Sequence, residues 1–408
     1  MTASGAVRPA RLVTLLGPAM VAGVAYLDPG NVASNVTAGA RFGYLLVWVV
    51  VVANATAWLV QYLSAKLGLS TGRSLPGLLG ERMRHPVARV AFWVQAELVA
   101  MATDIAEVLG GAIALQLLFG LPLVLGGVIT GVVSMVLLAL HDRRGSTTFE
   151  RVVTGMVVVI AVGFCAGIVA APIDGAQATA GLLPHFEGTG SVLLAASIVG
   201  ATVMPHAIYA HSALTRDRFG LVPPAQRRRV LVATRIDVSI ALAVAGTVNV
   251  VILLLSASTL RGVEGTSTIP GAWQAIGDAL GPVVATLFAV GLLASGLAST
   301  SVGAYAGAEI MAGLLRRRIP LLLRRGITLL PALLLLVLGV DPTLALVLSQ
   351  VALSFGIPFA LVPLVWLTAQ RGLLGENANR WWTTALAGVA AVLLVGLNVA
   401  LLALTIAG

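Results

Sequence analysis

The sequence predicts an all-α membrane protein with eleven transmembrane helices, built as two inverted repeats of five helices in which helices 1 and 6 are broken. The chain of 408 residues is 58% hydrophobic and 10% charged, with a mean hydropathy of +1.00, whereas soluble domains carry about 25% charged residues. Its apolar stretches are long enough to span a bilayer, and two of them contain a short polar interruption at corresponding positions. We therefore expect residues 1–408 to form a single transmembrane domain.

A helix that spans the membrane needs about 20 mostly apolar residues, and this criterion predicts the segments one by one along the chain. Short connections that carry Gly, Pro or charged residues separate them. Repeat one would cover about residues 12–171, repeat two about 190–369, and an additional helix about 383–406. The eleven predicted segments are 12–39 (broken), 43–66, 87–118, 121–140, 152–171, 190–214 (broken), 231–257, 280–314, 320–339, 343–369 and 383–406.

The distribution of Lys and Arg predicts the orientation of these helices. The N-terminal stub and the connections after segments 2, 4, 6, 8 and 10 hold 23 of the 25 basic residues, and the other side holds only Arg41 and Arg261. Because basic residues accumulate on the cytoplasmic side, we expect a cytoplasmic N-terminus and an extracytoplasmic C-terminus. The net charge of +9 then reflects topology and not nucleic-acid binding. The excess of Arg over the single Lys66 is typical of a GC-rich bacterial genome, so we expect a bacterial plasma (inner) membrane.

The two interruptions are DPGN at Asp28–Asn31 and MPH at Met204–His206. Proline lacks a backbone N–H and clashes with the carbonyl four residues earlier, which here frees the carbonyl groups of Ala25 and Ala201. Free backbone groups at membrane depth are tolerated only inside the protein or beside a cavity. Breaks at matching positions in two halves indicate the midplane site of a secondary transporter. Because each repeat has five crossings, the second repeat enters the membrane from the opposite face.

Three side chains at the breaks are candidate metal ligands, each with a structural alternative. Asp28 is costly at the bilayer centre unless it faces a cation, a proton or an Arg, but it could also cap the half-helix that follows. Asn31 could bind the same ion or hydrogen-bond between helices. Met204 could fill a packing gap, but its thioether suits soft or borderline metals and not Mg²⁺ or Ca²⁺. Together with the carbonyls of Ala25 and Ala201 and a water, these ligands predict a six-coordinate Mn²⁺ or Fe²⁺ site.

Segment 3 carries three acidic residues, Glu97, Asp104 and Glu107, within about 80° of arc on one helix face. Arg324 and Arg325 of segment 9 could supply their positive partner. A chain of acids that leads from a cation site is what a proton relay requires. A structural ion-pair network is the alternative interpretation.

Other polar residues also interrupt apolar segments. His206, at the second break, could relay protons as a neutral imidazole or pack as a hydrogen-bonded histidine, and packing is favoured more strongly for His211. Gln350 of segment 10 is the one amide that we expect near the metal site. Interhelical hydrogen bonds are expected of Asn54, Gln61 and Asn249.

The motifs of other chemistries are missing from the sequence. Cys165 is the single cysteine, which excludes an intramolecular disulfide and a thiolate cluster, and we interpret it as a packing residue. The chain contains no HExxH motif, no Walker A motif and no identifiable nucleophile–base pair. We therefore expect neither enzymatic activity nor a bound cofactor.

The two break motifs, with the run ELVAMATD at Glu97–Asp104, resemble the Nramp family of divalent-metal transporters in its bacterial, proton-coupled branch. The resemblance covers segments 1 to 11, where some relatives have twelve. It implies a LeuT-type inverted repeat, with a proton route that carries over to Asp104, Glu107 and Arg325. The metal ligands implied by the family, some of which bind in only some states, carry over to Asp28, Asn31, Met204, Ala25, Ala201 and Gln350.

The residues and the resemblance together predict a secondary transporter that imports Mn²⁺ or Fe²⁺ with protons by alternating access. Its expected partners are the divalent metal ion, protons and the lipid bilayer, with no nucleic acid and no obligate protein partner. One alternative is a passive divalent-metal channel or uniporter. Another is a Na⁺-coupled small-solute transporter on the same fold, which Asp28 disfavours because it would repel a substrate carboxylate.

Overall fold

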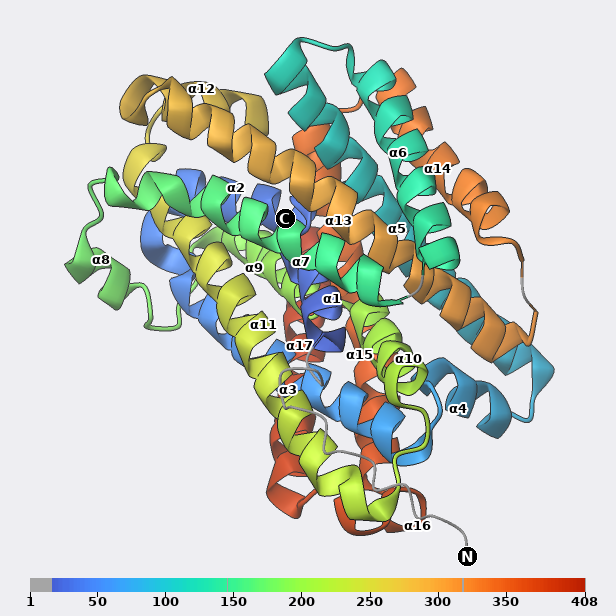
Figure 1. The fold of residues 1–408 in the computed structure, drawn as a ribbon. Coiled ribbons are helices and arrows are strands. Elements are labelled where there is room, and N and C mark those ends of the chain that lie inside the picture. The colour runs from blue at the N-terminus through green and yellow to red at the C-terminus, as the bar shows by residue number, and fades with distance from the viewer. Residues whose placement is uncertain (1–16, 145, 318, 408) are drawn as a thin grey trace, which may run out of the picture.

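The computed structural model describes residues 17–144, 146–317 and 319–407, and every regular element in these ranges is a helix (Figure 1). Eight helical stretches are long and apolar enough to cross a membrane, and Pro18–Leu27 and Leu123–Val136 form shorter apolar helices. The all-α prediction is therefore confirmed for the described residues. The number of crossings, eleven, stays a prediction, and the basic residues of the N-terminal stub lie outside the described residues.

The first half of the chain contains eleven helical elements within the described residues. Proline stands in the first turn of α2 and α5, where its missing N–H costs no hydrogen bond. α3 and α5 end at Gly72 and Gly120, whose positive φ angles of 64° and 67° suit glycine. The elements are α1 (Pro18–Val24), η2 (Ala25–Leu27), α2 (Pro29–Phe42), η3 (Gly43–Leu46), α3 (Val47–Thr71), α4 (Leu75–Arg82), α5 (Pro86–Phe119), α6 (Leu123–Arg144), α7 (Ser146–Cys165), η4 (Ala166–Val169) and α8 (Gly175–Ala180).

The second half repeats the pattern of a divided helix followed by long helices. The predicted segment 190–214 is divided into α9 and α10, and the predicted segment 231–257 belongs to a longer helix, α11, which begins at Pro224. The elements are α9 (Gly188–Thr202), α10 (Pro205–Phe219), α11 (Pro224–Thr259), α12 (Ile269–Leu280), α13 (Pro282–Leu315), α14 (Leu321–Val337), α15 (Pro342–Ala369), α16 (Arg371–Leu374), η5 (Gly375–Asn377) and α17 (Trp381–Ala407).

Long helices from the two halves pack against each other. α13 crosses α5, while α6 and α14 lie side by side at one edge of the molecule and α3 lies beside α11 (Figure 1). Small residues permit close approach: a Cβ atom on Gly163 of α7 would lie 2.8 Å from the Cα atom of Gly291 of α13. The divided helices are enclosed by these long helices, and the residues of α2 from Pro29 to Val36 are all buried.

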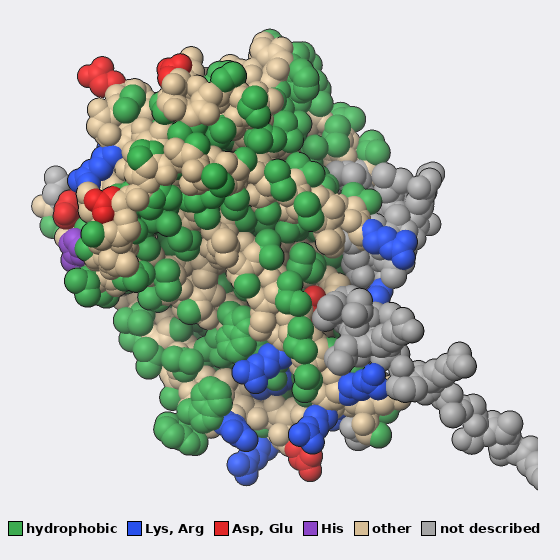
Figure 2. Space-filling view, turned by 60° about the vertical axis from the view of Figure 1, so that its left-hand side comes forward, with side chains coloured by type: hydrophobic (Ala, Val, Ile, Leu, Met, Phe, Trp, Pro, Cys, Tyr) green, Lys and Arg blue, Asp and Glu red, His purple; other side chains and the backbone are tan. Residues whose placement is uncertain are grey.

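Charged side chains are distributed unevenly over the surface. Figure 2 shows hydrophobic side chains across the middle of one face, whereas most Lys and Arg side chains in that view lie toward its lower part. We call the part of the molecule that carries Arg73, Arg82, Arg371 and Arg380 the basic end. Arg235, Arg324 and Arg325, which the charge count included on the basic side, lie inside α11 and α14, as the predicted segments 231–257 and 320–339 required.

Candidate metal centre

The first helix break lies between η2 and α2. Asp28 has an extended backbone, with φ −67° and ψ 161°, and α2 begins at the next residue, Pro29. The Asp28 carboxylate accepts hydrogen bonds from the backbone N–H groups of Asn31 (2.8 Å) and Gly30 (3.3 Å). Asp28 therefore caps α2, as one of its two predicted roles required. Capping uses part of the capacity of the carboxylate, since two oxygens offer about four acceptor positions.

The second break lies between α9 and α10. α9 ends at Thr202, the backbone of Val203 and Met204 is not helical, and α10 begins at Pro205. The side chain of Met204 is fully buried. Pro205 stands in the first turn of α10, where its missing N–H breaks no helical hydrogen bond. Met204 therefore lies in the non-helical step between α9 and α10.

The two breaks meet directly. The Asn31 side-chain Nδ2 donates to the carbonyl oxygen of Ala201 at 3.1 Å, which joins α2 to the end of α9. From α15, the Nε2 of Gln350 donates to the Asp28 carboxylate at 3.2 Å. The six predicted metal-site residues therefore belong to one region, and each has 0% of its surface exposed: Ala25, Asp28, Asn31, Ala201, Met204 and Gln350. The centre is closed to both sides of the molecule.

The prediction of two bare carbonyl groups was wrong for this structure. The oxygen of Ala25 accepts a hydrogen bond from the backbone N–H of Asp28 at 3.3 Å, because η2 tightens the chain before the break. The oxygen of Ala201 accepts from Asn31. Both groups still carry a second lone pair, so neither hydrogen bond removes them from a possible ligand set.

Two glycines allow Gln350 to reach the breaks. A Cβ atom on Gly30 would lie 1.7 Å from the Nε2 of Gln350, and one on Gly200 would lie 1.8 Å from the backbone oxygen of Gln350. A third close approach brings Gly110 of α5 against the ring of Pro29, where a Cβ atom would lie 2.0 Å from the Cβ atom of the proline. The backbone itself therefore forms part of the wall around Asp28.

The arrangement offers donor atoms of mixed hardness to a cation. Among the described residues no group of three or more His, Cys, Asp and Glu side chains could hold a metal ion, so a metal site here depends on carbonyl, amide and thioether donors beside the single carboxylate of Asp28. The Oε1 of Gln350 is buried and has no hydrogen-bond partner within the described part of the chain. A buried acceptor without a donor is costly, and a cation would satisfy it.

A second polar layer, of which the sequence predicted only separate interhelical hydrogen bonds, lies around Tyr26, two residues before Asp28. The backbone oxygen of Tyr26 accepts from the side chains of Asn31 (2.8 Å) and Asn249 (3.1 Å). The hydroxyl of Tyr26 accepts from the side-chain amide of Gln61, and the Oε1 of Gln61 lies 2.7 Å from the Nδ1 of His211. The available signal was that Tyr26 precedes Asp28 by two residues, so helices that pack on the break also meet Tyr26. Asn54 does not join this layer, since it donates to Val50 of its own helix at 2.8 Å.

The predicted acids of segment 3 pair with the two arginines of α14. Glu97 forms an ion pair with Arg324 at 2.6 Å, and Asp104 forms one with Arg325. The Oε2 of Glu107 lies 3.6 Å from the same Arg325, although neither carboxylate oxygen of Glu107 has a hydrogen-bond partner among the described residues. Burial makes this network costly to break at any one member.

His206 connects the break at Met204 to this ion-pair network. Its Nδ1 lies 3.1 Å from the hydroxyl of Thr103, the residue before Asp104 on α5. The histidine is 2% exposed. The structure thus pairs the acids of α5 with the arginines of α14 and places His206 of α10 beside Thr103 of α5. This geometry fits both a relay and a structural network.

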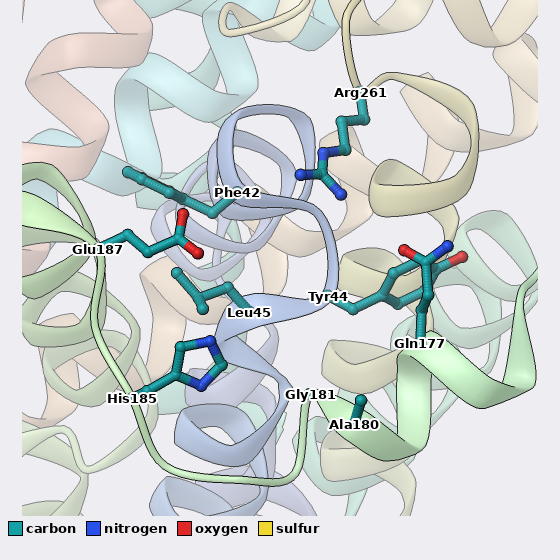
Figure 3. Close-up of a pocket in the computed structure, with 9 residues that line it drawn as sticks. All are labelled: Phe42, Tyr44, Leu45, Gln177, Ala180, Gly181, His185, Glu187 and Arg261. Atoms are coloured by element: carbon teal, nitrogen blue, oxygen red, sulfur yellow. The ribbon is translucent and has the colours of Figure 1, made fainter.

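A separate pocket of about 190 Å³ lies beside the end of α2 (Figure 3). Figure 3 shows Glu187, His185 and Arg261 around it. Phe42, Tyr44, Leu45, Gln177, Ala180 and Gly181 complete its lining. None of the predicted metal or proton residues lines this pocket.

Comparison with known proteins agrees along almost the whole chain. Residues 19–404 match the family described as "Natural resistance-associated macrophage protein-like". The chain is 60% identical over 395 residues to the divalent metal cation transporter MntH of Mycobacterium tuberculosis, which covers 97% of this chain and 92% of that protein. A solved structure of a manganese transporter of Eremococcus coleocola superposes with a TM-score of 0.84 at 31% identity, covering 95% of this chain and 85% of that one. MhsT, solved with L-phenylalanine, shares the fold alone, with a TM-score of 0.62 at 14% identity over 93% of this chain and 98% of that one.

Proposed function

The chain belongs to the Nramp family, and on that premise we propose that it imports Mn²⁺ or Fe²⁺ together with protons across the bacterial plasma membrane by alternating access. Its family is one of metal-ion transporters and not of enzymes, as the names of the relatives from Mycobacterium tuberculosis and Eremococcus coleocola state. The observation that carries the proposal is the meeting of the two helix breaks. Asn31 bonds to Ala201 across them, and Asp28 and Gln350 complete a closed polar centre.

The donor set supports a transition metal as the cargo. Met204 supplies a soft thioether, which binds Mn²⁺ or Fe²⁺ better than it binds Mg²⁺ or Ca²⁺. Asp28 supplies the only formal negative charge among the six residues. One carboxylate gives moderate affinity, as a carrier that must release its cargo requires. The side-chain oxygens of Asn31 and Gln350 and the carbonyl oxygens of Ala25 and Ala201 would complete the coordination with water.

Proton coupling is supported by the acids that continue from the centre into the protein. His206 lies beside Thr103, the neighbour of Asp104, and Arg325 is the positive partner of Asp104 and Glu107. Glu97 and Arg324 extend the set. An interior-negative membrane potential of 100 mV adds about 2.3 kcal/mol per elementary charge to inward movement. The potential therefore drives both the divalent ion and the proton inward, and an inward proton gradient adds to this drive.

The proposed topology follows the distribution of charge. We infer that the basic end faces the cytoplasm, with the N-terminus there and the C-terminus outside. Eleven crossings would then comprise two repeats of five, about 12–171 and 190–369, and an additional helix at about 383–406. The likeness to MhsT supports this LeuT-type arrangement at the level of the fold. Because all six centre residues are fully buried, this structure corresponds to a closed state between the two open ones.

Uptake into proteoliposomes that contain a pH dye tests the proposal. Mn²⁺ should enter with acidification of the interior, and an inward proton gradient should accelerate it. Mn²⁺ flux without proton movement would instead indicate a channel or uniporter. Flux that requires Na⁺ and carries an organic solute would indicate the second alternative. A panel of Mn²⁺, Fe²⁺, Ca²⁺ and Mg²⁺ in the same vesicles establishes the preferred ion.

A further inference from the structure

An arginine lies on the outer face of α11, among side chains that face the bilayer. Arg235 is exposed, and so are its neighbours Val232, Ile236 and Ile240, at 50%, 43% and 47%. Because a face of this composition contacts lipid in a membrane protein, the charge of Arg235 has to be placed either at the polar boundary of the bilayer or beside an anion.

The position of Arg235 along α11 corresponds to the headgroup level of one leaflet. It precedes the last residue of the helix, Thr259, by 24 residues (259 − 235). At 1.5 Å per residue that is about 36 Å, slightly more than the hydrocarbon thickness of about 30 Å. Arg235 therefore reaches the headgroups of the leaflet at the basic end.

A wall of aromatic rings holds the arginine. Its guanidinium carbon lies 5.6 Å from the ring centroid of Trp58 on α3. The indole N–H of Trp58 donates to the hydroxyl of Ser239 at 2.9 Å, which fixes the ring against α11. Trp58 stacks on Tyr62 with centroids 6.3 Å apart, and the ammonium of Lys66 lies 5.9 Å from the Tyr62 centroid. Two cations thus lie at the ends of one stacked pair.

The charge of Arg235 is not neutralised by the protein within the described ranges. No carboxylate there lies within 4 Å of its guanidinium, although other arginines of the chain form ion pairs. The acid closest in sequence, Asp237, instead accepts the backbone N–H groups of Gly17 (3.0 Å) and Ala19 (2.9 Å) of the α1 region. A guanidinium has five N–H donors, and the face of Trp58 accepts none of them in the plane.

We propose that Arg235, with Trp58 and Tyr62, forms a binding site for the phosphate of an anionic phospholipid in the leaflet at the basic end. The phosphate accepts paired hydrogen bonds from the guanidinium, which matches its geometry. One acyl chain lies along Ile236 and Ile240, which follow Arg235 on α11 toward the middle of the bilayer. An anionic headgroup fits better than a zwitterionic one, because the amine of the latter would meet the positive field of Arg235 and Lys66.

Native mass spectrometry of the purified, full-length protein tests this site with phosphatidylglycerol as the probe and phosphatidylcholine as the comparison. Arg235→Gln should weaken binding of one phosphatidylglycerol about fivefold, the effect of one basic residue at a membrane surface. Arg380→Gln is the matched control, since Arg380 is also an exposed arginine of the basic end. It should leave that binding unchanged.

Three results would overturn the site: equal binding by Arg235→Gln and wild type, an equal loss in Arg380→Gln, or equal retention of phosphatidylcholine. If Arg235→Gln does not fold, Trp58→Leu takes its place, because it keeps the charge and removes the ring that orients it. It should also weaken phosphatidylglycerol binding, and unchanged binding in that variant would overturn the proposal. These readouts do not depend on metal transport, so they can fail while the proposed function stands.

Discussion

Replacing Gly200 by alanine should weaken Mn²⁺ binding at the metal centre without changing any of its ligands. A methyl group at this position would lie 1.8 Å from the backbone oxygen of Gln350 and 2.9 Å from the backbone nitrogen of Ser354. Ordinary contact begins at 3.4 Å, so α9 and α15 would have to separate by 1.6 Å (3.4 − 1.8). Overpacking of this kind costs about 1–3 kcal/mol. If the closed arrangement that holds Gln350 against Asp28 bears this cost, Mn²⁺ affinity falls about 5- to 150-fold.

Isothermal titration of the purified protein with Mn²⁺ measures this affinity, and uptake into proteoliposomes measures its consequence. Gly155→Ala in α7 is the matched control, because a Cβ atom there meets no atom within 4 Å. Size-exclusion profiles and thermal unfolding establish that both variants are folded. Wild-type affinity in Gly200→Ala, or an equal loss in Gly155→Ala, would refute the argument that backbone contact between α9 and α15 shapes the centre.

Three further substitutions probe the charges and the thioether. Asp28→Asn removes the one charged candidate ligand and should abolish Mn²⁺ binding by calorimetry, so retained wild-type affinity would contradict its role. Met204→Ala should let Ca²⁺ or Mg²⁺ compete better while Mn²⁺ is still transported, and unchanged selectivity in a competition assay would show that sulfur does not select the ion. Arg325→Gln leaves the buried carboxylates of Asp104 and Glu107 without their cation and should lower the free energy of unfolding by about 3–5 kcal/mol. Adding Asp104→Asn should restore part of that loss, and a double variant no more stable than the single one in a denaturation series would speak against the pairing.

The sequence predicted those features that depend on local chemistry. The starts of α2 and α10 were predicted from Pro29 and Pro205 together with the polar residues beside them. Proline alone would not have sufficed, because α14 and α15 continue through Pro331, Pro358 and Pro363. The three acids of α5 predicted a positively charged partner, because three carboxylates on one apolar helix face are costly without one. Arg324 and Arg325 supply it. These inferences required no knowledge of how the helices pack.

Features that depend on the distance between helices could not be predicted. The spacing between α9 and α15 decides that Gly200 must lack a side chain, and nothing in the residues around it reveals that contact. The bond from Asn31 to Ala201 likewise depends on the relative position of two half-helices 170 residues apart in sequence. The predicted segment 231–257 already contains Arg235, but α11 begins at Pro224 and continues for eleven residues on the N-terminal side of this arginine.

The pairing of Asn31 with Ala201 bears on how a carrier returns for its next load. A carrier that works by alternating access has to change from one open state to the other without a bound ion. Buried polar groups without hydrogen-bond partners would raise the free energy of that step. Here the side-chain amide of Asn31 donates to the carbonyl oxygen of Ala201, so both groups have a partner in the absence of an ion. Under the alternating access proposed above, a bound ion would replace this hydrogen bond and release of the ion would restore it, so the polar groups would have partners in both halves of the cycle.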